Sequence, residues 1–252
     1  MKRYLLYNEI RASLFLSLVS SLILYVLLII MLASFPININ IENDTLKKLF
    51  YFPDNINDSN SYYCFLLEYF IILGSIFTSI VATKVIVHDK KSGYDEYLFS
   101  LPIKRSELFL NKIVSIVLIV LTYNLLFLAL SFISNFVFDL NIKNTIILKL
   151  NLALLISNLT FASIGVLIGS FIKPSFIYIK CLMFNLVLLI LSIPDRLLNF
   201  KILQYANPFS YFKLYKLLNN SFKNSFIIAS GCIIVFSISI SKTMYDEYDV
   251  IK

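Results

Sequence analysis

The chain consists of six long apolar stretches separated by polar segments. About 20 consecutive apolar residues form a helix long enough to cross the hydrocarbon core of a membrane. Charged residues near the end of such a stretch, as at Glu68 and Lys84, do not exclude a span, because the side chain can reach the headgroup region. The pattern predicts an all-α membrane protein with six transmembrane helices, at about 12–35, 62–87, 113–138, 146–172, 175–194 and 225–241.

Two amphipathic segments accompany these spans. Residues 4–11 mix apolar and charged positions, which suits either a short N-terminal interfacial helix or the solvated first turns of the first span. Residues 195–224 predict an outer amphipathic segment that lies in the interface, with Pro208 near the start of its helix, where a missing amide donor costs little. The apolar side of that segment has helical spacing and consists of Tyr211, Leu214, Tyr215, Leu218 and Phe222.

Lys and Arg residues indicate the orientation of the spans, because they concentrate in cytoplasmic loops. With both termini cytoplasmic, 13 of the 22 Lys and Arg residues fall on the inner side. The loop at 88–112, between the second and third spans, is the densest basic loop for its length. We therefore predict that both termini and this loop are cytoplasmic.

The composition agrees with a single transmembrane domain over residues 1–252. Hydrophobic residues make up 59% and charged residues 15%, against about 45–50% and about 25% in soluble globular domains. This excludes both a soluble fold and a disordered chain. With this composition, the net charge of +7 favours contact with anionic membrane lipid and not with nucleic acid. The frequent Ile, Lys and Asn residues are typical of a bacterial protein, so we expect the location to be a bacterial cell membrane.

Candidate chemistry is sparse. Cys64, Cys181 and Cys232 are widely spaced and His88 is the single histidine, so we expect no disulfide framework and no metal site. The chain has five glycines and no Gly-x-x-x-x-Gly-Lys-Ser/Thr stretch that could hold a phosphate. We expect no cofactor and no enzymatic activity from this chain.

The predicted span interiors carry no Asp, Glu, His, Lys or Arg, which argues against a proton-driven carrier and an intramembrane protease. We interpret the serines of the spans, such as Ser131 and Ser163, as residues of helix packing or as donors to their own backbone. The stretch Gly165-Val166-Leu167-Ile168-Gly169 has the small-xxx-small spacing of closely packed helices, and we expect that packing to be intramolecular.

The loop at 88–112 has the clearest pattern. A short helix is predicted between Gly93 and Pro102, because Asp95 and Glu96 suit the positive end of a helix dipole and Pro102 ends the helix. Ser106 is then expected to cap the third span, with Glu107 in its first turn. The predicted short helix carries an apolar stripe that can dock on a soluble partner or rest on lipid, and it consists of Tyr94, Tyr97, Leu98 and Leu101.

Residues Asp89 to Lys112 resemble the permease subunits of ABC exporters of the second class. The resemblance comprises an acidic residue, Gly, Tyr and Glu, then Ser-Leu-Pro-Ile, a basic pair, and a basic residue that enters the next span. Glu9-Ile10-Arg11 resembles the amphipathic helix before the first span of that family, and Asn207-Pro208-Phe209 resembles its segment before the last span.

This resemblance implies six spans, cytoplasmic termini and a coupling helix that docks on a separate P-loop ATPase subunit. The ATPase-coupling interface would then consist of Gly93, Tyr94, Asp95, Glu96, Tyr97, Leu98 and Leu101. It further implies a second permease subunit, identical or homologous. An apolar path favours an amphipathic peptide, an antibiotic or a lipid-like cargo. Two alternatives stay open: an ATPase-independent carrier or channel, and a non-transporting membrane scaffold or sensor.

Overall fold

The described part of the chain is helical. The computed structural model describes residues 15, 18–30, 32, 59–92, 104–171, 176–198, 201–212, 214 and 223–247, of which 89–92, 195–198 and 201–203 are described by their backbone alone. No strand occurs within these ranges. The all-α prediction is confirmed for them.

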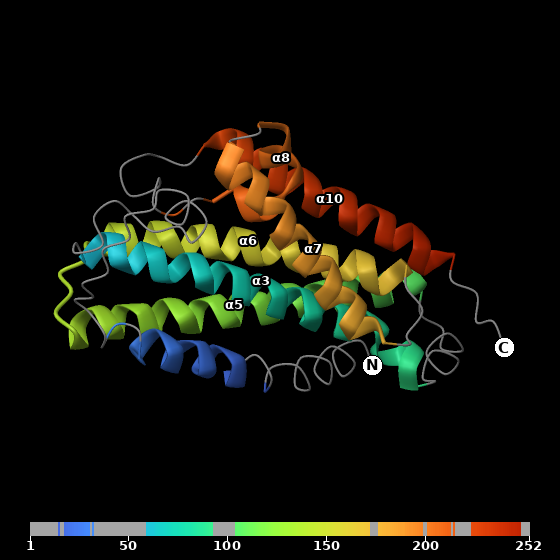
Figure 1. Cartoon of the computed structure of the whole chain (residues 1–252). Helices are drawn as coiled ribbons and strands as arrows, with labels where there is room; N and C mark the ends of the chain where they lie inside the picture. The colour runs from blue at the N-terminus through green and yellow to red at the C-terminus, as the bar shows by residue number, and fades with distance from the viewer. Residues whose placement is uncertain are drawn as a thin grey trace.

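Five long helices make up the bundle. Each is long and apolar enough to cross a membrane, which is compatible with a multi-pass membrane protein. They are α3 (Ser59–Ser92), α5 (Arg105–Val137), α6 (Asn144–Phe171), α7 (Ile177–Leu198) and α10 (Asn224–Asp246). The α3, α5 and α6 helices run roughly along one direction, and α7 and α10 cross them obliquely (Figure 1).

The predicted first span is described only in part. A shorter apolar helix covers Leu18–Ile30, and most of the remaining residues of 12–35 lie outside the described residues, as do residues 4–11 of the predicted interfacial helix. Leu24 and Leu28 of this helix are buried against the other helices. The structure therefore supports five spanning helices and one shorter apolar helix, and the sixth span remains a prediction.

Two helices extend beyond the predicted spans into the loop at 88–112. The α3 helix continues to Ser92, and α5 begins at Arg105, eight residues before the predicted span and one residue before its predicted cap, Ser106. Hydropathy measures the part of a helix that matches the hydrocarbon thickness, whereas the hydrogen-bonded helix can continue through charged residues. The prediction that Ser106 caps this helix is wrong, since Lys104 precedes the first turn and Ser106 lies inside it, while Glu107 does stand in the first turn.

The α7 helix does not end at Pro194, where the predicted span ends. It continues to Leu198 with Pro194 inside it, although proline has no amide donor for the preceding turn. A short helix α8 (Lys201–Ala206) and a 3-10 turn η1 (Pro208–Ser210) follow. Asn207 fixes this turn, because its Oδ1 accepts the amide of Phe209 at 3.1 Å and its Nδ2 donates to the carbonyl of Leu188 at 2.6 Å.

The outer amphipathic segment at 195–224 packs part of its apolar side against the bundle. Tyr211 is 4% exposed and Leu214 is fully buried, and both belong to the main apolar cluster with Leu28 and Phe226. Neighbouring helices therefore cover these two side chains, and the interfacial location of the segment stays a prediction. Tyr215, Leu218 and Phe222 lie outside the described residues.

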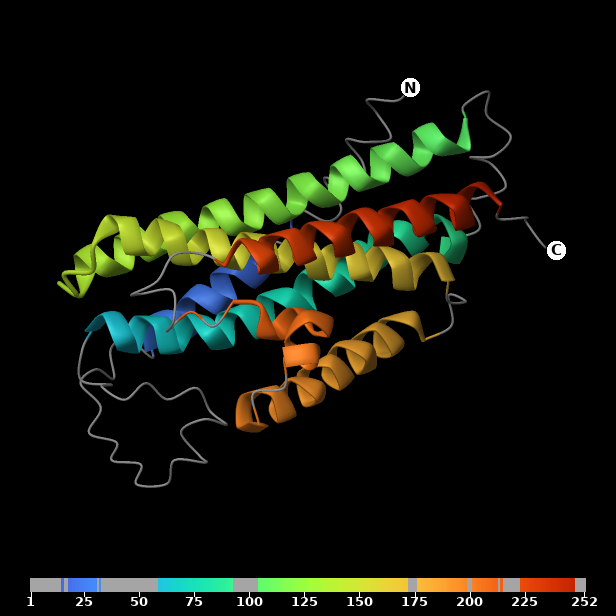
Figure 2. The same cartoon turned by 90° about the horizontal axis from the view of Figure 1, so that it is seen from above.

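The α3 and α6 helices form the centre of the bundle. About 67% and 72% of their most apolar windows are buried, against 22% for α7 and α10. The two helices are parallel, because Ser75 pairs with Ser157, Thr78 with Asn158 and Thr83 with Gly165 at a nearly constant separation of 80 to 82 residues. In the view from above, α5 and α7 lie on opposite sides of this pair (Figure 2).

Close packing at the α3–α6 contact depends on glycine. A Cβ atom added to Gly165 would lie only 2.2 Å from the carbonyl oxygen of Ser79. Gly169, one turn later, packs against the side chain of Ile86. The small-xxx-small stretch thus packs within the chain, as predicted from the sequence.

Candidate functional site

The predicted ATPase-coupling residues lie between two described helix ends. Gly93, Tyr94, Asp95, Glu96, Tyr97, Leu98 and Leu101 are themselves outside the described residues. The backbone is described up to Ser92, where α3 ends, and again from Lys104, directly before α5. We call this end of the bundle the loop end, and its geometry shows how residues 93–103 are held at their base.

Lys112 joins the two helices that hold the loop. Its side chain is 2% exposed, and its Nζ donates a hydrogen bond to the carbonyl of Val85 in α3 at 2.8 Å. A buried ammonium group is costly unless its donors are paired. The carbonyl of Val85 supplies one such partner. Lys112 therefore fixes the position of α5 along α3.

An apolar cluster surrounds this contact. It brings α3, α5, α6 and the end of α10 together through buried side chains, with Ile177 of α7 among them. These side chains are held by close van der Waals packing, so the base of the loop rests on a packed core. The buried members nearest the loop in sequence are Val85, Ile86, Val87, Leu108 and Phe109.

The last helix joins the same end of the bundle. Arg105, the first residue of α5, donates from Nη1 to the carbonyl of Asp246, the last residue of α10, at 3.0 Å. One turn into α5, the ring of Phe109 lies 5.5 Å from the ring of Tyr245. Both rings are buried. These contacts join residues that are 136 to 141 positions apart, and the sequence carries no signal that pairs them.

A buried polar network crosses the centre of the bundle. Asn158 of α6 donates from Nδ2 to Oδ1 of Asn124 in α5 at 3.0 Å, and Asn124 donates to the carbonyl of Val120 in its own helix. Thr78 of α3 donates to the carbonyl of Asn158 at 3.2 Å. Inside a membrane protein such bonds replace water as the partner of polar groups. The network ties α3, α5 and α6 together.

A second polar contact attaches α7 to α3. Asn185 donates from Nδ2 to the hydroxyl of Ser79 at 3.2 Å, and the sulfur of Cys181 lies 3.2 Å from the same hydroxyl and 3.4 Å from that of Thr83. Cys181 and Asn185 are fully buried, whereas Phe184 between them is 43% exposed. The α7 helix thus faces the bundle with small and polar residues and turns large apolar residues outward.

Sequence reasoning did not identify these buried amides. The serines did follow their predicted role, since Ser131 and Ser163 donate to carbonyls three or four residues earlier in their own helices. The structure departs further from the sequence prediction at Glu68, which the sequence places near the end of a span. It is 5% exposed, and since α3 begins nine residues earlier at Ser59, it lies about 14 Å along the helix at 1.5 Å per residue. The interior of the described bundle therefore does contain a carboxyl group.

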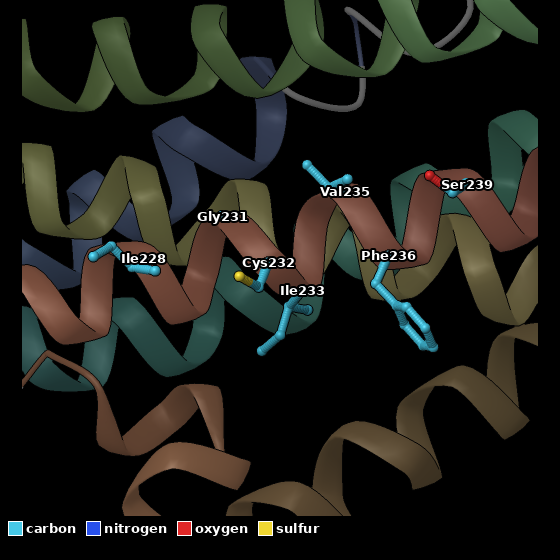
Figure 3. Close-up of a pocket in the computed structure, with 7 residues that line it drawn as sticks. All are labelled: Ile228, Gly231, Cys232, Ile233, Val235, Phe236 and Ser239. Carbon is cyan, nitrogen blue, oxygen red and sulfur yellow. The ribbon is translucent and has the colours of Figure 1, made fainter.

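A shallow apolar groove with a volume of about 750 Å³ runs along the outer face of α10. Figure 3 shows its side chains on one helix, with the thiol of Cys232 among them. Cys232 is exposed, whereas the other two cysteines are buried. The lining residues are Ile228, Gly231, Cys232, Ile233, Val235, Phe236 and Ser239.

Within the described ranges, no three His, Cys, Asp or Glu side chains come together in a way that could hold a metal ion. Comparisons with protein-family models, with curated proteins and with solved structures found no match for this chain. The residues and their geometry therefore carry the functional argument alone.

Proposed function

We propose that the chain is the membrane permease subunit of an ATP-driven ABC export complex. In this proposal two permease subunits, identical or homologous, line the path and two separate ATPase subunits dock on residues 93–101. Both termini and the loop end face the cytoplasm of a bacterial cell. The cargo is an amphipathic peptide, an antibiotic or a lipid-like molecule, in keeping with the apolar helices.

The observation that carries the proposal is the base of the predicted coupling loop. The resemblance to the exporter family is fullest over Asp89 to Lys112, and buried side chains stand a few residues from 93–103 on both sides, at Val87 and at Leu108. Lys112 bonds to Val85, and Leu108 and Phe109 are buried. Coupling to an ATPase requires that a movement of this loop reach the spanning helices, and the contacts between α3 and α5 supply a route for it.

The test is a paired substitution in the predicted stripe. Tyr97→Ala together with Leu98→Ala should strongly weaken co-purification of the ATPase subunit and abolish ATP-driven transport. Truncating a buried aromatic anchor typically costs about 2 kcal/mol or more at such interfaces. Membrane insertion should survive, because no spanning helix is changed. A matched control is Phe99→Ala with Ser100→Ala, which removes an aromatic ring from outside the stripe. Unimpaired coupling in the first pair would contradict the proposal.

Glu96 separates two roles within the same loop. If it only complements the helix dipole, Glu96→Gln costs about 0.3–1 kcal/mol and leaves transport nearly intact. A severe loss of transport at normal expression would assign Glu96 to a charge pair with the ATPase. Purified permease alone should hydrolyse no ATP, because the sequence has no phosphate-binding loop.

The buried carboxyl group of Glu68 favours one alternative, an ATPase-independent carrier, since carboxyl groups at membrane depth mark proton and ion pathways. Transport by the purified chain in vesicles without ATP or an ATPase, lost in Glu68→Gln, would establish that function. The exporter proposal expects no such transport. A scaffold or sensor would transport nothing in either preparation.

A further inference from the structure

A fully buried amide in the middle of the bundle has an oxygen without a hydrogen bond. The side chain of Asn158 is 0% exposed, and its Oδ1 accepts no hydrogen bond from any described residue. Buried polar atoms of native proteins nearly always have a partner, and inside a membrane no bulk water can supply one. A donor is therefore required at this oxygen.

The hydrogen bonds around Asn158 determine which end of its amide is the oxygen. The carbonyl of Val120 can only accept, so the atom of Asn124 that bonds to it at 2.7 Å must be Nδ2. Oδ1 of Asn124 then faces Asn158 and accepts from its Nδ2 at 3.0 Å. Exchanging the nitrogen and oxygen of Asn158 would place two oxygens against each other. The atom without a hydrogen bond is therefore an acceptor.

Gly74 of α3 leaves room beside this oxygen. From the position that a Cβ atom of Gly74 would take, Asn158 Oδ1 and the hydroxyl oxygen of Tyr123 each lie 3.1 Å away, and Asn158 Nδ2 lies 3.4 Å away. These are the nearest atoms of other helices, and all three are polar. Tyr123 is 1% exposed, and its ring packs 5.4 Å from that of Phe77, which holds the hydroxyl beside Gly74.

The spacing of the two oxygens suits one water molecule. Because both lie 3.1 Å from the same point, they can be no further apart than twice that distance, and a water bridges two oxygens through hydrogen bonds of about 2.7–2.8 Å each. A buried water needs two to four polar partners, and Asn158 Oδ1 and the Tyr123 hydroxyl provide two. A metal cation fits less well, because the third polar atom is the Nδ2 donor of Asn158, which repels it.

We propose that Gly74, Tyr123 and Asn158 form a binding site for a single water molecule, which donates to Asn158 Oδ1 and pairs with the hydroxyl of Tyr123. The three residues lie near the middle of α3, α5 and α6. The water thus joins three helices at a depth that bulk solvent does not reach. Glycine is required at position 74 because a side chain would take the place of the water. The site is independent of the proposed transport function.

The first part of the test detects the water in the native chain in lipid nanodiscs. Brief X-ray pulses convert water into hydroxyl radicals, which oxidise the side chains that they touch, and isotopically labelled water marks the oxygen that is added. Tyr123 should be oxidised, whereas Phe127, equally buried one turn further along α5, should stay unmodified. Gly74→Ser should abolish the oxidation of Tyr123. A Tyr123 that stays as unmodified as Phe127 in the native chain would overturn the proposal.

The second part compares Gly74→Ser with Gly74→Ala, which add the same Cβ atom and differ only in the hydroxyl group. Alanine has the higher helix propensity, so it should be the more stable variant if Asn158 needs no donor here. If a donor is needed, serine supplies one, whereas alanine leaves Asn158 Oδ1 buried without it. We expect the ratio of folded to unfolded chain, from reversible unfolding in mixed micelles, to be roughly threefold or more higher in Gly74→Ser.

Asn158→Leu is the control background, because it removes the acceptor. The advantage of serine over alanine should disappear there, since no oxygen of residue 158 remains to be paired. An equal or lower ratio in Gly74→Ser than in Gly74→Ala would overturn the proposal. An advantage of serine that persists in Asn158→Leu would do so as well, because the gain would then not come from Asn158.

Discussion

Replacing Gly165 by alanine tests the packing at the centre of the bundle. The added Cβ would lie 2.2 Å from the carbonyl oxygen of Ser79 and 2.9 Å from two backbone carbons of the same residue. Ordinary contact begins near 3.4 Å, so α3 and α6 must separate by roughly 1 Å. Backbone atoms cannot rotate away as a side chain can. The helices must therefore move apart or tilt.

This separation also weakens a hydrogen bond between the two helices. Thr83 donates to the carbonyl of Gly165 at 2.9 Å, and a further 1 Å takes the pair beyond hydrogen-bonding distance. Overpacking costs about 1–3 kcal/mol, and a lost hydrogen bond costs about 1 kcal/mol. Alanine regains about 1 kcal/mol of helix propensity. The net loss in the free energy of unfolding should be about 1–3 kcal/mol.

Two other glycines provide matched controls. Gly231 has no heavy atom within 4 Å of its added Cβ, so Gly231→Ala should gain up to about 1 kcal/mol from propensity alone. Gly169→Ala should fall between, because its added Cβ would lie 3.1 Å from Cβ of Ile86, so a shift of a few tenths of an ångström relieves the contact. The free energies are measured by reversible unfolding in mixed detergent micelles. If Gly165→Ala and Gly231→Ala agree within about 0.5 kcal/mol, the close contact between α3 and α6 does not exist.

Three further predictions concern single side chains. A membrane-permeant maleimide should modify only Cys232 in the folded chain, because Cys64 and Cys181 are buried; mass spectrometry that finds a second adduct would contradict this burial. Lys112→Met keeps the volume but removes the bond to the carbonyl of Val85, so the free energy of unfolding should fall by about 1 kcal/mol, whereas a gain would show that the buried charge is a net cost. Burial raises the pKa of Tyr211 to about 12 from its ordinary value of 10. The raised pKa means that the neutral phenol, which donates to the carbonyl of Tyr205, contributes stability fully below pH 10 and loses it as the pH rises through about 12. The midpoint temperature of unfolding should therefore fall less in Tyr211→Phe than in the native chain between pH 10 and about 12.

The sequence predicts the apolar helices well because hydropathy and length alone determine whether a helix can cross a membrane. Gly165 and Gly169 were also recognisable, since small residues one turn apart mark close helix contacts. The ends of the helices were not predicted. Arg105 begins α5 although hydropathy starts the span eight residues later, because a hydrogen-bonded helix can continue through polar and charged residues.

Pairings across the bundle are beyond this kind of reasoning. Asn124 and Asn158 lie on different helices, 34 residues apart, and nothing in either local sequence favours one partner over the many carbonyls nearby. The spacing of Tyr211 places it on the apolar side of an amphipathic segment. Its burial depends on packing against Phe226 and the first apolar helix, which the local sequence does not indicate. For residues 93–101 the local sequence indicates a function, but the structure describes only the residues on either side of them.

The parallel pairing of α3 and α6 has a consequence for how the chain is made. Thr83 meets Gly165 only after 82 more residues have been added, which takes about 4–16 s at a synthesis rate of about 5–20 residues per second. Throughout that interval α3 sits in the membrane or its insertion channel with hydroxyl groups that still lack their final partners. Thr83 and Thr78 also donate to the carbonyls of Ser79 and Ser75 in their own helix. These local bonds can occupy the hydroxyls during the wait, so that α3 remains stable until α6 arrives.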